Sequence, residues 1–260
     1  MAEAKGDLSN ARILVTNDDG IHAPGLKACV RIARQLSKDV WVVAPESEQS
    51  ATSHSLTVRR PLRLRKIGHR RYTVDGTPTD CVVIALRKLL AERPADLVLS
   101  GVNHGANMGE DVTYSGTVAA AMEGALLGVP SIALSQNRVS GKVVSWATAE
   151  RHGPPIVAKL LSLPWPREVL MNVNFPPVGP DQVQGIRVVR QGRRDTDVQV
   201  IERQDPAGRA YLWIGDFVDD ETSERGTDLA AIKERAIAVT PLHLDLTHKG
   251  TLKKLAGLFS

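Results

Sequence analysis

Between Arg12 and Ser135 the chain alternates short β-branched runs with segments that carry apolar residues at helical spacing. Strands are expected at residues 12–16, 40–44, 71–74, 96–100 and 131–134, and helices at residues 24–36, 82–90 and 113–128. Strands that alternate with helices in this way fold into a parallel sheet with helices on both faces. The first part of the chain therefore predicts an α/β fold.

This alternation ends after Ser135. A hairpin is expected around DPAGR at residues 205–209, and further elements are expected at residues 146–161, 169–175, 228–235, 237–240 and 251–259. We interpret residues 1–184 as an α/β core. Residues 185–260 are interpreted as an appendage that completes the fold and mediates contacts between subunits.

The composition argues against binding to nucleic acid. The chain has 260 residues, of which 42% are hydrophobic, enough for one large domain. Its net charge of +4 is only mildly basic, and its 4% aromatic residues are too few for the base-stacking platforms of single-strand binders. Nucleic acid is therefore not expected as a partner.

The cysteines and the N-terminus bear on the compartment. Cys29 and Cys81 each lie in an apolar, helix-like stretch, which fits neither a disulfide framework nor a zinc pattern. The first ten residues lack the apolar region of a signal peptide, and no apolar run reaches the roughly 18 residues of a membrane helix. A soluble, cytoplasmic protein with no membrane partner is expected.

Two adjacent carboxylates, Asp18 and Asp19, stand where the first expected strand ends. In an open α/β sheet, ligands bind at the carboxyl ends of the strands. Neighbouring carboxylates repel each other unless a cation or a proton lies between them. A helix cap with a turn explains the same residues equally well. This segment alone leaves a metal site and a cap open.

Polar loops also follow two other expected strands, at residues 47–55 and 101–111. In a parallel sheet these loops open on the same edge as Asp18 and Asp19. Together they offer carboxylate, hydroxyl and amide oxygens and no cysteine, which suits Mg²⁺ or Mn²⁺ rather than zinc. The three loops predict a site for a hard divalent cation.

Ser115, Gly116 and Thr117 precede an Ala-rich helical stretch. Hydroxyls and free N–H groups at a helix N-terminus bind phosphate, although taken alone these residues favour simple capping. Their combination with the oxygen-rich loops favours a phosphoryl substrate.

Several long segments in a fixed order carry a specific resemblance. They are ILVTNDDGI, VVAPESEQSATSHSLT, DGTPTDCV, LVLSGVNHGANMGEDVTYSGTVAAAMEGALLGVPSIALS and MNVNFP. The chain resembles the SurE family of survival proteins, which are metal-dependent phosphatases acting on nucleoside monophosphates. The resemblance implies a three-layer, Rossmann-like, mostly parallel sheet with a C-terminal β-hairpin and helix appendage. It also implies a phosphoric monoester hydrolase, a 5′-nucleotidase, with 3′-monophosphates and short polyphosphate as further candidate substrates.

The resemblance also implies roles for particular residues. The family's metal ligands correspond to Asp18, Asp19, Ser50 and Asn103, and the two aspartates are also the candidate catalytic residues. The expected phosphate- or substrate-binding residues are Asn107, Ser115, Gly116, Thr117, His104 and His54. One divalent cation per subunit, Mg²⁺ or Mn²⁺, and a homodimer or homotetramer are expected.

The chain departs from the family pattern at three positions. Ser53 stands where the family usually has glycine, and His104 and Ala106 stand where arginine and proline are common. None of these changes removes an expected metal ligand. They bear on the shape of the pocket and on substrate preference.

Two other functions have to be weighed against a metal-dependent phosphatase. A covalent aspartyl-phosphate route is disfavoured because the two aspartates of that pattern are separated by one residue, whereas Asp18 and Asp19 are adjacent. A non-catalytic nucleotide- or nucleic-acid-binding protein is suggested by the basic segment at residues 59–71. Apolar residues alternate within that segment, which favours a pair of strands with solvated charges.

Overall fold

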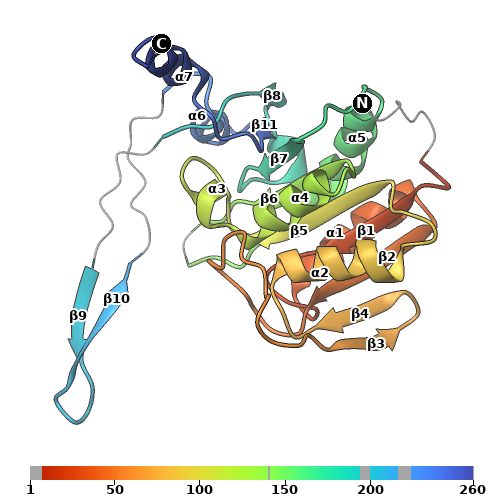
Figure 1. Ribbon diagram of the computed structural model, residues 1–260, viewed down its shortest axis with the longest axis horizontal. Helices are drawn as coiled ribbons and strands as arrows, with labels where there is room; N and C mark the ends of the chain where they lie inside the picture. Colours follow the sequence, from red (N-terminus) through yellow and green to blue (C-terminus); the bar gives the residue numbers. More distant parts are fainter. Residues whose placement is uncertain (1–7, 140, 194–199, 216–223, 260) are drawn as a thin grey trace.

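A nine-stranded sheet forms the centre of the protein in the computed structural model, which describes residues 8–139, 141–193, 200–215 and 224–259 (Figure 1). The strands of this sheet are β1 (Arg12–Thr16), β2 (Asp39–Pro45), β3 (Leu64–Gly68), β4 (Arg71–Val74), β5 (Leu97–His104), β6 (Ser131–Gln136), β7 (Val169–Phe175), β8 (Ile186–Val188) and β11 (Ile237–His243). Their order is β3-β4-β2-β1-β5-β6-β7-β11-β8. Only the pairs β3–β4 and β7–β11 are antiparallel, so the expected mostly parallel α/β sheet is confirmed.

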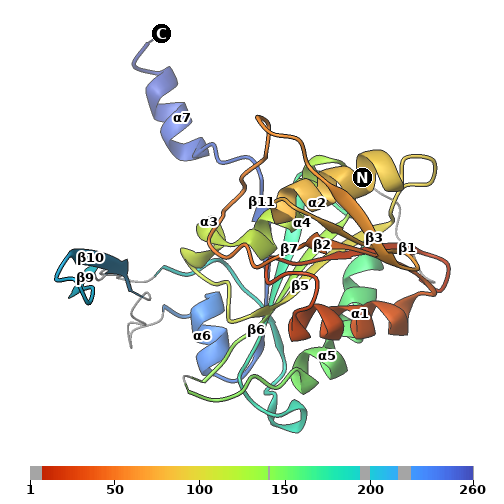
Figure 2. The same cartoon turned by 90° about the horizontal axis from the view of Figure 1, so that it is seen from below.

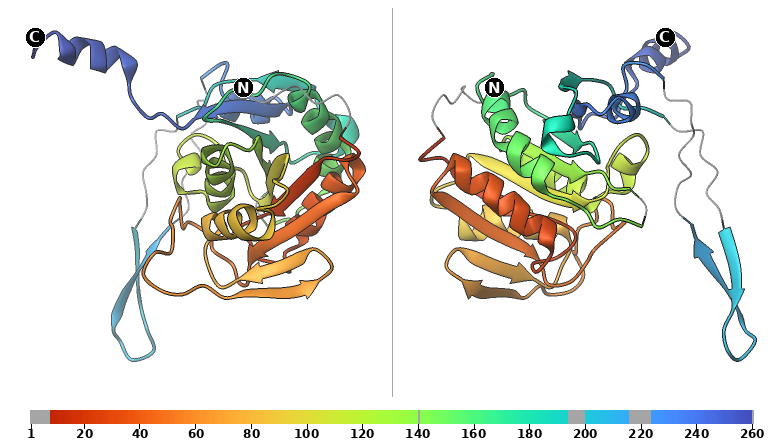
Figure 3. Two further views of the ribbon diagram at one scale, coloured as in Figure 1. Left: turned by 45° about the vertical axis from the view of Figure 1, so that its right-hand side comes forward. Right: turned by 180° about the vertical axis from the view of Figure 1, so that it is seen from behind.

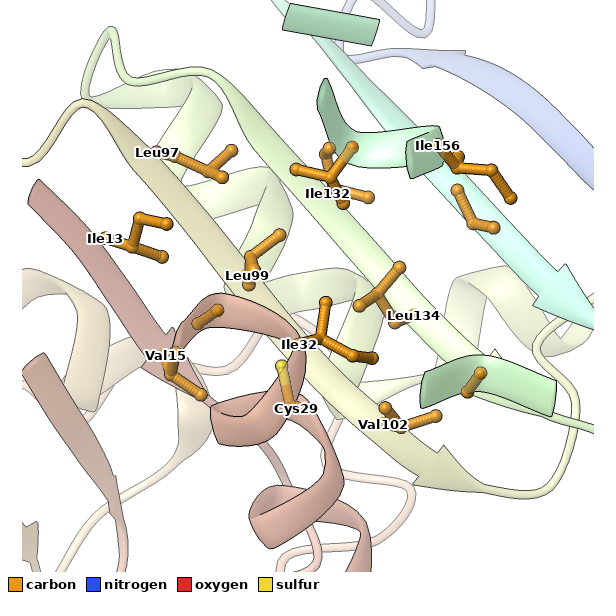
Figure 4. Packing of buried hydrophobic residues seen from close by; sticks show 14 of the residues in the cluster. Ile13, Val15, Cys29, Ile32, Leu97, Leu99, Val102, Ile132, Leu134 and Ile156 are labelled. Carbon is orange, nitrogen blue, oxygen red and sulfur yellow. The ribbon is translucent and has the colours of Figure 1, made fainter. Parts of the chain in front are cut away.

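Helices cover both faces of the sheet (Figure 2). The helices are α1 (Pro24–Leu36), α2 (Pro78–Ile84), α3 (Asp111–Tyr114), α4 (Gly116–Leu126), α5 (Ala147–Leu161), α6 (Asp228–Lys233) and α7 (Lys249–Ala256). On one face, Ile13 and Val15 of β1 pack with Cys29 and Ile32 of α1 (Figure 4). On the other face, Leu14 packs in a cluster with residues of α2 and α4. Burial on both faces explains why β1 is apolar throughout.

Helices α2 and α4 start at other residues than expected because side-chain caps override the apolar periodicity. Helix α2 begins at Pro78, since Thr77 and Asp80 form a capping box there. The helix expected at residues 113–128 is divided into α3 and α4 at Ser115, whose backbone is extended. The Ser115 hydroxyl accepts a hydrogen bond from the N–H of Val118 at 3.0 Å. This break starts a new helix directly beside Asp18.

The C-terminal quarter both joins the sheet and extends beyond it. Strands β8 and β11 pair within the main sheet. Strands β9 (Val200–Gln204) and β10 (Ala210–Ile214) form the expected hairpin around residues 205–209. This hairpin and α7 project away from the body of the protein (Figure 3). A domain boundary at residue 184 stays a prediction.

Within the described residues, no helix combines the length and the apolar character needed to cross a bilayer.

The basic segment at residues 59–71 contributes to an antiparallel strand pair, β3–β4. Four of its seven lysine and arginine side chains form ion pairs with nearby carboxylates. Arg60 and Arg63 lie 3.7 and 3.8 Å from Asp75, and Arg70 lies 2.9 Å from Asp39. The segment is thus a strand pair with paired surface charges, as its alternating pattern predicts, and these contacts weaken the case for a nucleic-acid-binding surface.

Candidate active site

The loops that follow β1, β2 and β5 meet at the carboxyl edge of the sheet. The N–H of Gln49, in the loop after β2, donates to the carbonyl of Asp18 at 2.8 Å. The N–H of His104, at the end of β5, donates to Oδ2 of Asp19 at 3.3 Å. The expectation that three polar loops share one edge is therefore confirmed, because strands β2, β1 and β5 are adjacent and parallel.

Asp18 is a buried carboxyl group, only 5% exposed. Its pKa is raised from an ordinary 3.8 to about 6, mainly by burial and in smaller part by the charge of Asp19, although a hydrogen bond from the Thr117 side chain acts in the opposite direction. The Thr117 hydroxyl donates to Oδ1 of Asp18. Loss of hydration thus disfavours the charged form more than this hydrogen bond supports it.

Asp19 is more accessible than Asp18, yet its pKa is raised as well. Burial and the charge of Glu48 raise its pKa, against a hydrogen bond from the N–H of His104. Neither Asp18 nor Asp19 forms an ion pair with Lys, Arg or His in the described part of the chain. The two carboxylates therefore form a centre of negative charge without a cationic side chain beside it.

Ser50 lies in the loop after β2, and Asn103 is the last residue but one of β5. The exposed Ser50 hydroxyl donates to Glu48 at 2.8 Å. Nδ2 of Asn103 donates to the carbonyl of Gly105 at 3.1 Å, which leaves Oδ1 as the amide atom for a ligand. A bulge between Gly101 and Asn103 shifts the register of β5 against β6 at this point. Bulges of this kind re-aim side chains at the edges of sheets.

The donor set suits a hard cation. Among the described residues, no three His, Cys, Asp or Glu side chains gather as a metal cluster, so amide and hydroxyl oxygens have to complete the set begun by the aspartates. The side chain of Asn17, next to Asp18, is fully buried, and its Oδ1 has no hydrogen-bond partner in the described structure. Unpaired carboxylates together with an orphaned amide oxygen fit a divalent cation.

The N-terminus of α4 faces Asp18. The oxygen of Ser115 caps the N–H of Val118, so capping, the simpler interpretation of Ser115, is confirmed. Gly116 leaves no room for a side chain, since a Cβ there would lie 2.8 Å from Cβ of Asp18. The N–H groups of Gly116 and Thr117 belong to the first helical turn and have no acceptor within the helix. That of Thr117 is directed at the Asp18 carboxylate, which leaves the N–H of Gly116 as the group that can meet an anion beside Asp18.

Asn107, expected only as a phosphate- or substrate-binding residue, belongs to a buried amide network that the sequence analysis did not predict. Its Nδ2 donates to the Ser135 hydroxyl at 2.8 Å, and its N–H donates to Oδ1 of Asn174 at 2.9 Å. Asn172 and Asn174 both donate to its carbonyl, at 2.7 and 3.0 Å. The two asparagines of β7 therefore fix the Asn107 backbone. The available signal was two asparagines at alternate positions of an otherwise apolar strand, which puts both on one face.

His54 ties the second loop to α4. Its Nε2 lies 2.9 Å from Oε2 of Glu123, and this contact fixes the loop. Ser53 next to it has φ of +53°, a conformation that favours glycine. Its N–H and hydroxyl donate to the carbonyls of Tyr114 and Thr113 at 3.1 and 2.8 Å. These two bonds support the strained serine where the family usually has glycine.

Solved and curated relatives extend over nearly the whole chain. A protein from Paramagnetospirillum magneticum named 5′-nucleotidase SurE is 56% identical over 97% of this chain and 97% of its own length. The protein of the same name from Parvibaculum lavamentivorans is 55% identical over 97% of this chain and 92% of its own. The crystal structure of SurE protein from Aquifex aeolicus has a TM-score of 0.84 and 41% identity, covering 96% of this chain and 100% of that one.

This fold and these relatives define a phosphoric monoester hydrolase. The family model described as survival protein SurE matches residues 13–198. The chain belongs to the SurE family.

Proposed function

We propose that the chain is a 5′-nucleotidase that needs a divalent cation to hydrolyse nucleoside 5′-monophosphates to nucleoside and phosphate. The observation that carries this proposal is Asp18, a buried carboxyl group with a pKa near 6, a helix N-terminus beside it and no cationic partner among the described residues. A cation and an anionic substrate together would balance these charges. The names of the relatives point to the same activity.

The cation would be held by Asp18, Asp19, Ser50 and Asn103, one Mg²⁺ or Mn²⁺ for each subunit. When bound, it supplies Lewis acidity to the phosphoryl group and a water of lowered pKa as nucleophile. The chain's own groups bind the phosphoryl group and accept the proton. The N–H of Gly116, at the start of α4, binds a phosphoryl oxygen and stabilises the charge that spreads over the phosphoryl group. Asp19, the more accessible carboxylate, accepts a proton from the attacking water.

The test is phosphate release from AMP and GMP by the purified full chain with Mg²⁺, Mn²⁺ or Zn²⁺, and with EDTA. We expect turnover that EDTA abolishes and that excess Mg²⁺ or Mn²⁺ restores. A 3′-monophosphate and short polyphosphate in the same panel measure the breadth of the substrate range. Two results would contradict the proposal: turnover that EDTA does not affect, and no turnover with any of the nucleotides and metals.

The projecting C-terminal elements support a homo-oligomer. Leu212, Trp213 and Ile214 of β10 are 61–79% exposed, and Leu252 and Leu255 of α7 are 56% and 46% exposed. Exposed apolar side chains gathered on projecting elements are typical of subunit interfaces. The proposed occupant of these surfaces is a second copy of the chain, in a homodimer or a homotetramer.

Charges placed on α7 are expected to disrupt this assembly. The double substitution Leu252→Glu and Leu255→Glu replaces two apolar contacts with carboxylates, so light scattering on an eluting size-exclusion peak should give a smaller mass than the wild type. Leu126→Glu, at an equally exposed leucine of α4, serves as the control. A monomeric wild type, or an unchanged mass for the double variant, would speak against the proposed role of α7.

The cytoplasm is the compartment that we propose, since Cys29 and Cys81 are both buried free thiols.

A further inference from the structure

A pocket of about 530 Å³ adjoins the candidate active site on the side of Asp19. Its lining residues come from four segments of the chain: Asp19, Ala23, Pro24, Gly25, Glu48, His104, Val143, Val144 and Trp146. This volume is within the range of about 300–1,000 Å³ that is usual for small-molecule sites. Because Asp19 belongs to both, a ligand bound at the aspartates can extend into this pocket.

Two aromatic rings line this pocket. The rings of His104 and Trp146 have centroids 6.3 Å apart and are tilted by 52°. The indole of Trp146 packs against the start of α1, where a Cβ on Gly25 would lie 3.0 Å from its Cη2. Trp146 is partly buried on the hydrophobic core, so its position is fixed by packing. The glycine is required first by the carbonyl oxygen of Val102, which would lie 2.0 Å from such a Cβ, and it also leaves the ring its place.

The charge of the lining selects the kind of group that this pocket can take. Among the residues that the structure describes, no lysine or arginine lines this pocket, whereas Asp19 and Glu48 do. A second phosphate would therefore meet like charge. Carboxylates instead accept hydrogen bonds from sugar hydroxyls, and the apolar side chains of Val143, Val144 and Trp146 suit a flat, uncharged ring.

The geometry points to Trp146, with His104, as the platform on which the nucleobase of the substrate stacks, with Glu48 placed for the ribose hydroxyls. This inference rests on the proposed function, because it assumes a phosphomonoester held at Asp18 and Asp19. It adds a specificity-determining residue, since a phosphomonoester without a base gains nothing from the platform. His104, which stands where the family usually has arginine, lines this same pocket.

The kinetic test compares AMP with ribose 5-phosphate, which lacks the base. In Trp146→Ala the ratio of kcat/KM for AMP to kcat/KM for ribose 5-phosphate should fall at least about tenfold, the usual scale for losing one base–aromatic stack. Trp146→Phe should retain most of the ratio. Leu163→Ala, which removes another exposed apolar side chain, is the control and should keep the ratio of the wild type. A ratio in Trp146→Ala within twofold of the wild type overturns the inference.

A binding measurement separates this inference from the proposed function. Guanosine, which has no phosphate, is titrated into the full chain in EDTA while tryptophan fluorescence is recorded. We expect saturable quenching that is largely lost in Trp146→Phe. Equal quenching in that variant overturns the platform even if AMP is hydrolysed. If the wild type hydrolyses neither phosphate ester, the proposed function fails, and the loss of quenching in Trp146→Phe still supports a nucleoside site.

Discussion

Replacing Asp18 with asparagine is expected to lower metal-dependent phosphate release by about 10³-fold or more, while it stabilises the metal-free protein at neutral pH. The amide keeps the shape of the carboxyl group and still accepts the hydrogen bond from Thr117. It lacks the negative charge that would attract the cation. The loss of activity and the gain in stability have one cause, since the same buried charge is costly in the empty site and needed in the loaded one.

The pH dependence of stability follows from the raised pKa of Asp18. Its pKa is about 6 in the folded protein and an ordinary 3.8 outside this environment. The folded state therefore binds the proton more tightly than the unfolded state. The stabilisation that this proton provides is complete below the unfolded pKa and is lost as the pH rises from about 4 to above 6. The difference corresponds to about 3 kcal/mol at pH 7, as an upper limit.

Calorimetry in EDTA at pH 4.5 and pH 8 measures this effect. Asp18→Asn should raise the Tm about three times as much at pH 8 as at pH 4.5, since Asp18 is mostly protonated in the folded wild type at the lower pH although it is already largely ionised in the unfolded state. Asp181→Asn, at a carboxylate whose side chain is 82% exposed, is the matched control and should change the Tm little at either pH. A lower Tm for Asp18→Asn at pH 8, or phosphate release at the wild-type rate, would refute the assignment of Asp18.

The sequence predicted the fold and the location of the site because both follow from local patterns. Apolar runs ending in polar residues identified β1 and β5, and parallel topology brings their carboxyl ends to one edge. Asp18 and Asp19 were found in this way. The residues were thus placed from the sequence, whereas the pKa of Asp18 depends on burial by α4, which only the structure gives.

Contacts between distant parts of the chain could not be predicted in the same way. Asn107 meets Asn172 and Asn174 across 65 and 67 positions, and no spacing rule pairs them. Trp146 was expected only as the start of a helix, and its place beside His104 depends on how α5 packs on α1. A cap at Ser115 was expected, whereas the separate helix α3 before it was not, because the residues on both sides keep a helical pattern. These features determine the shape of the site.

Gly116→Ala is expected to lower kcat about a hundredfold without unfolding the protein, the scale of a displacement of about 1 Å at a catalytic group. A Cβ at this position would lie 2.8 Å from Cβ of Asp18, 3.0 Å from its Oδ2 and 3.2 Å from Cγ of Pro78. Either Asp18 or the first turn of α4 has to move. Asp18 and the first turn of α4 both belong to the site. A shift of either one increases the distance between the Asp18 carboxylate and the N–H groups of Gly116 and Thr117.

Stability and activity should respond differently to this substitution. Alanine is favoured over glycine in a helix by about 0.5–1 kcal/mol, which offsets part of the steric cost, so a large change in Tm is not expected. The measurement is kcat for AMP at saturating Mg²⁺, together with the Mg²⁺ concentration at half-maximal rate. Gly68→Ala, where the nearest atom would be Cβ of Arg71 at 3.6 Å, is the control and should retain the wild-type kcat. Wild-type kcat for Gly116→Ala would mean that close contact between α4 and Asp18 is not required, and the proposed phosphate site at the start of α4 would have to be abandoned.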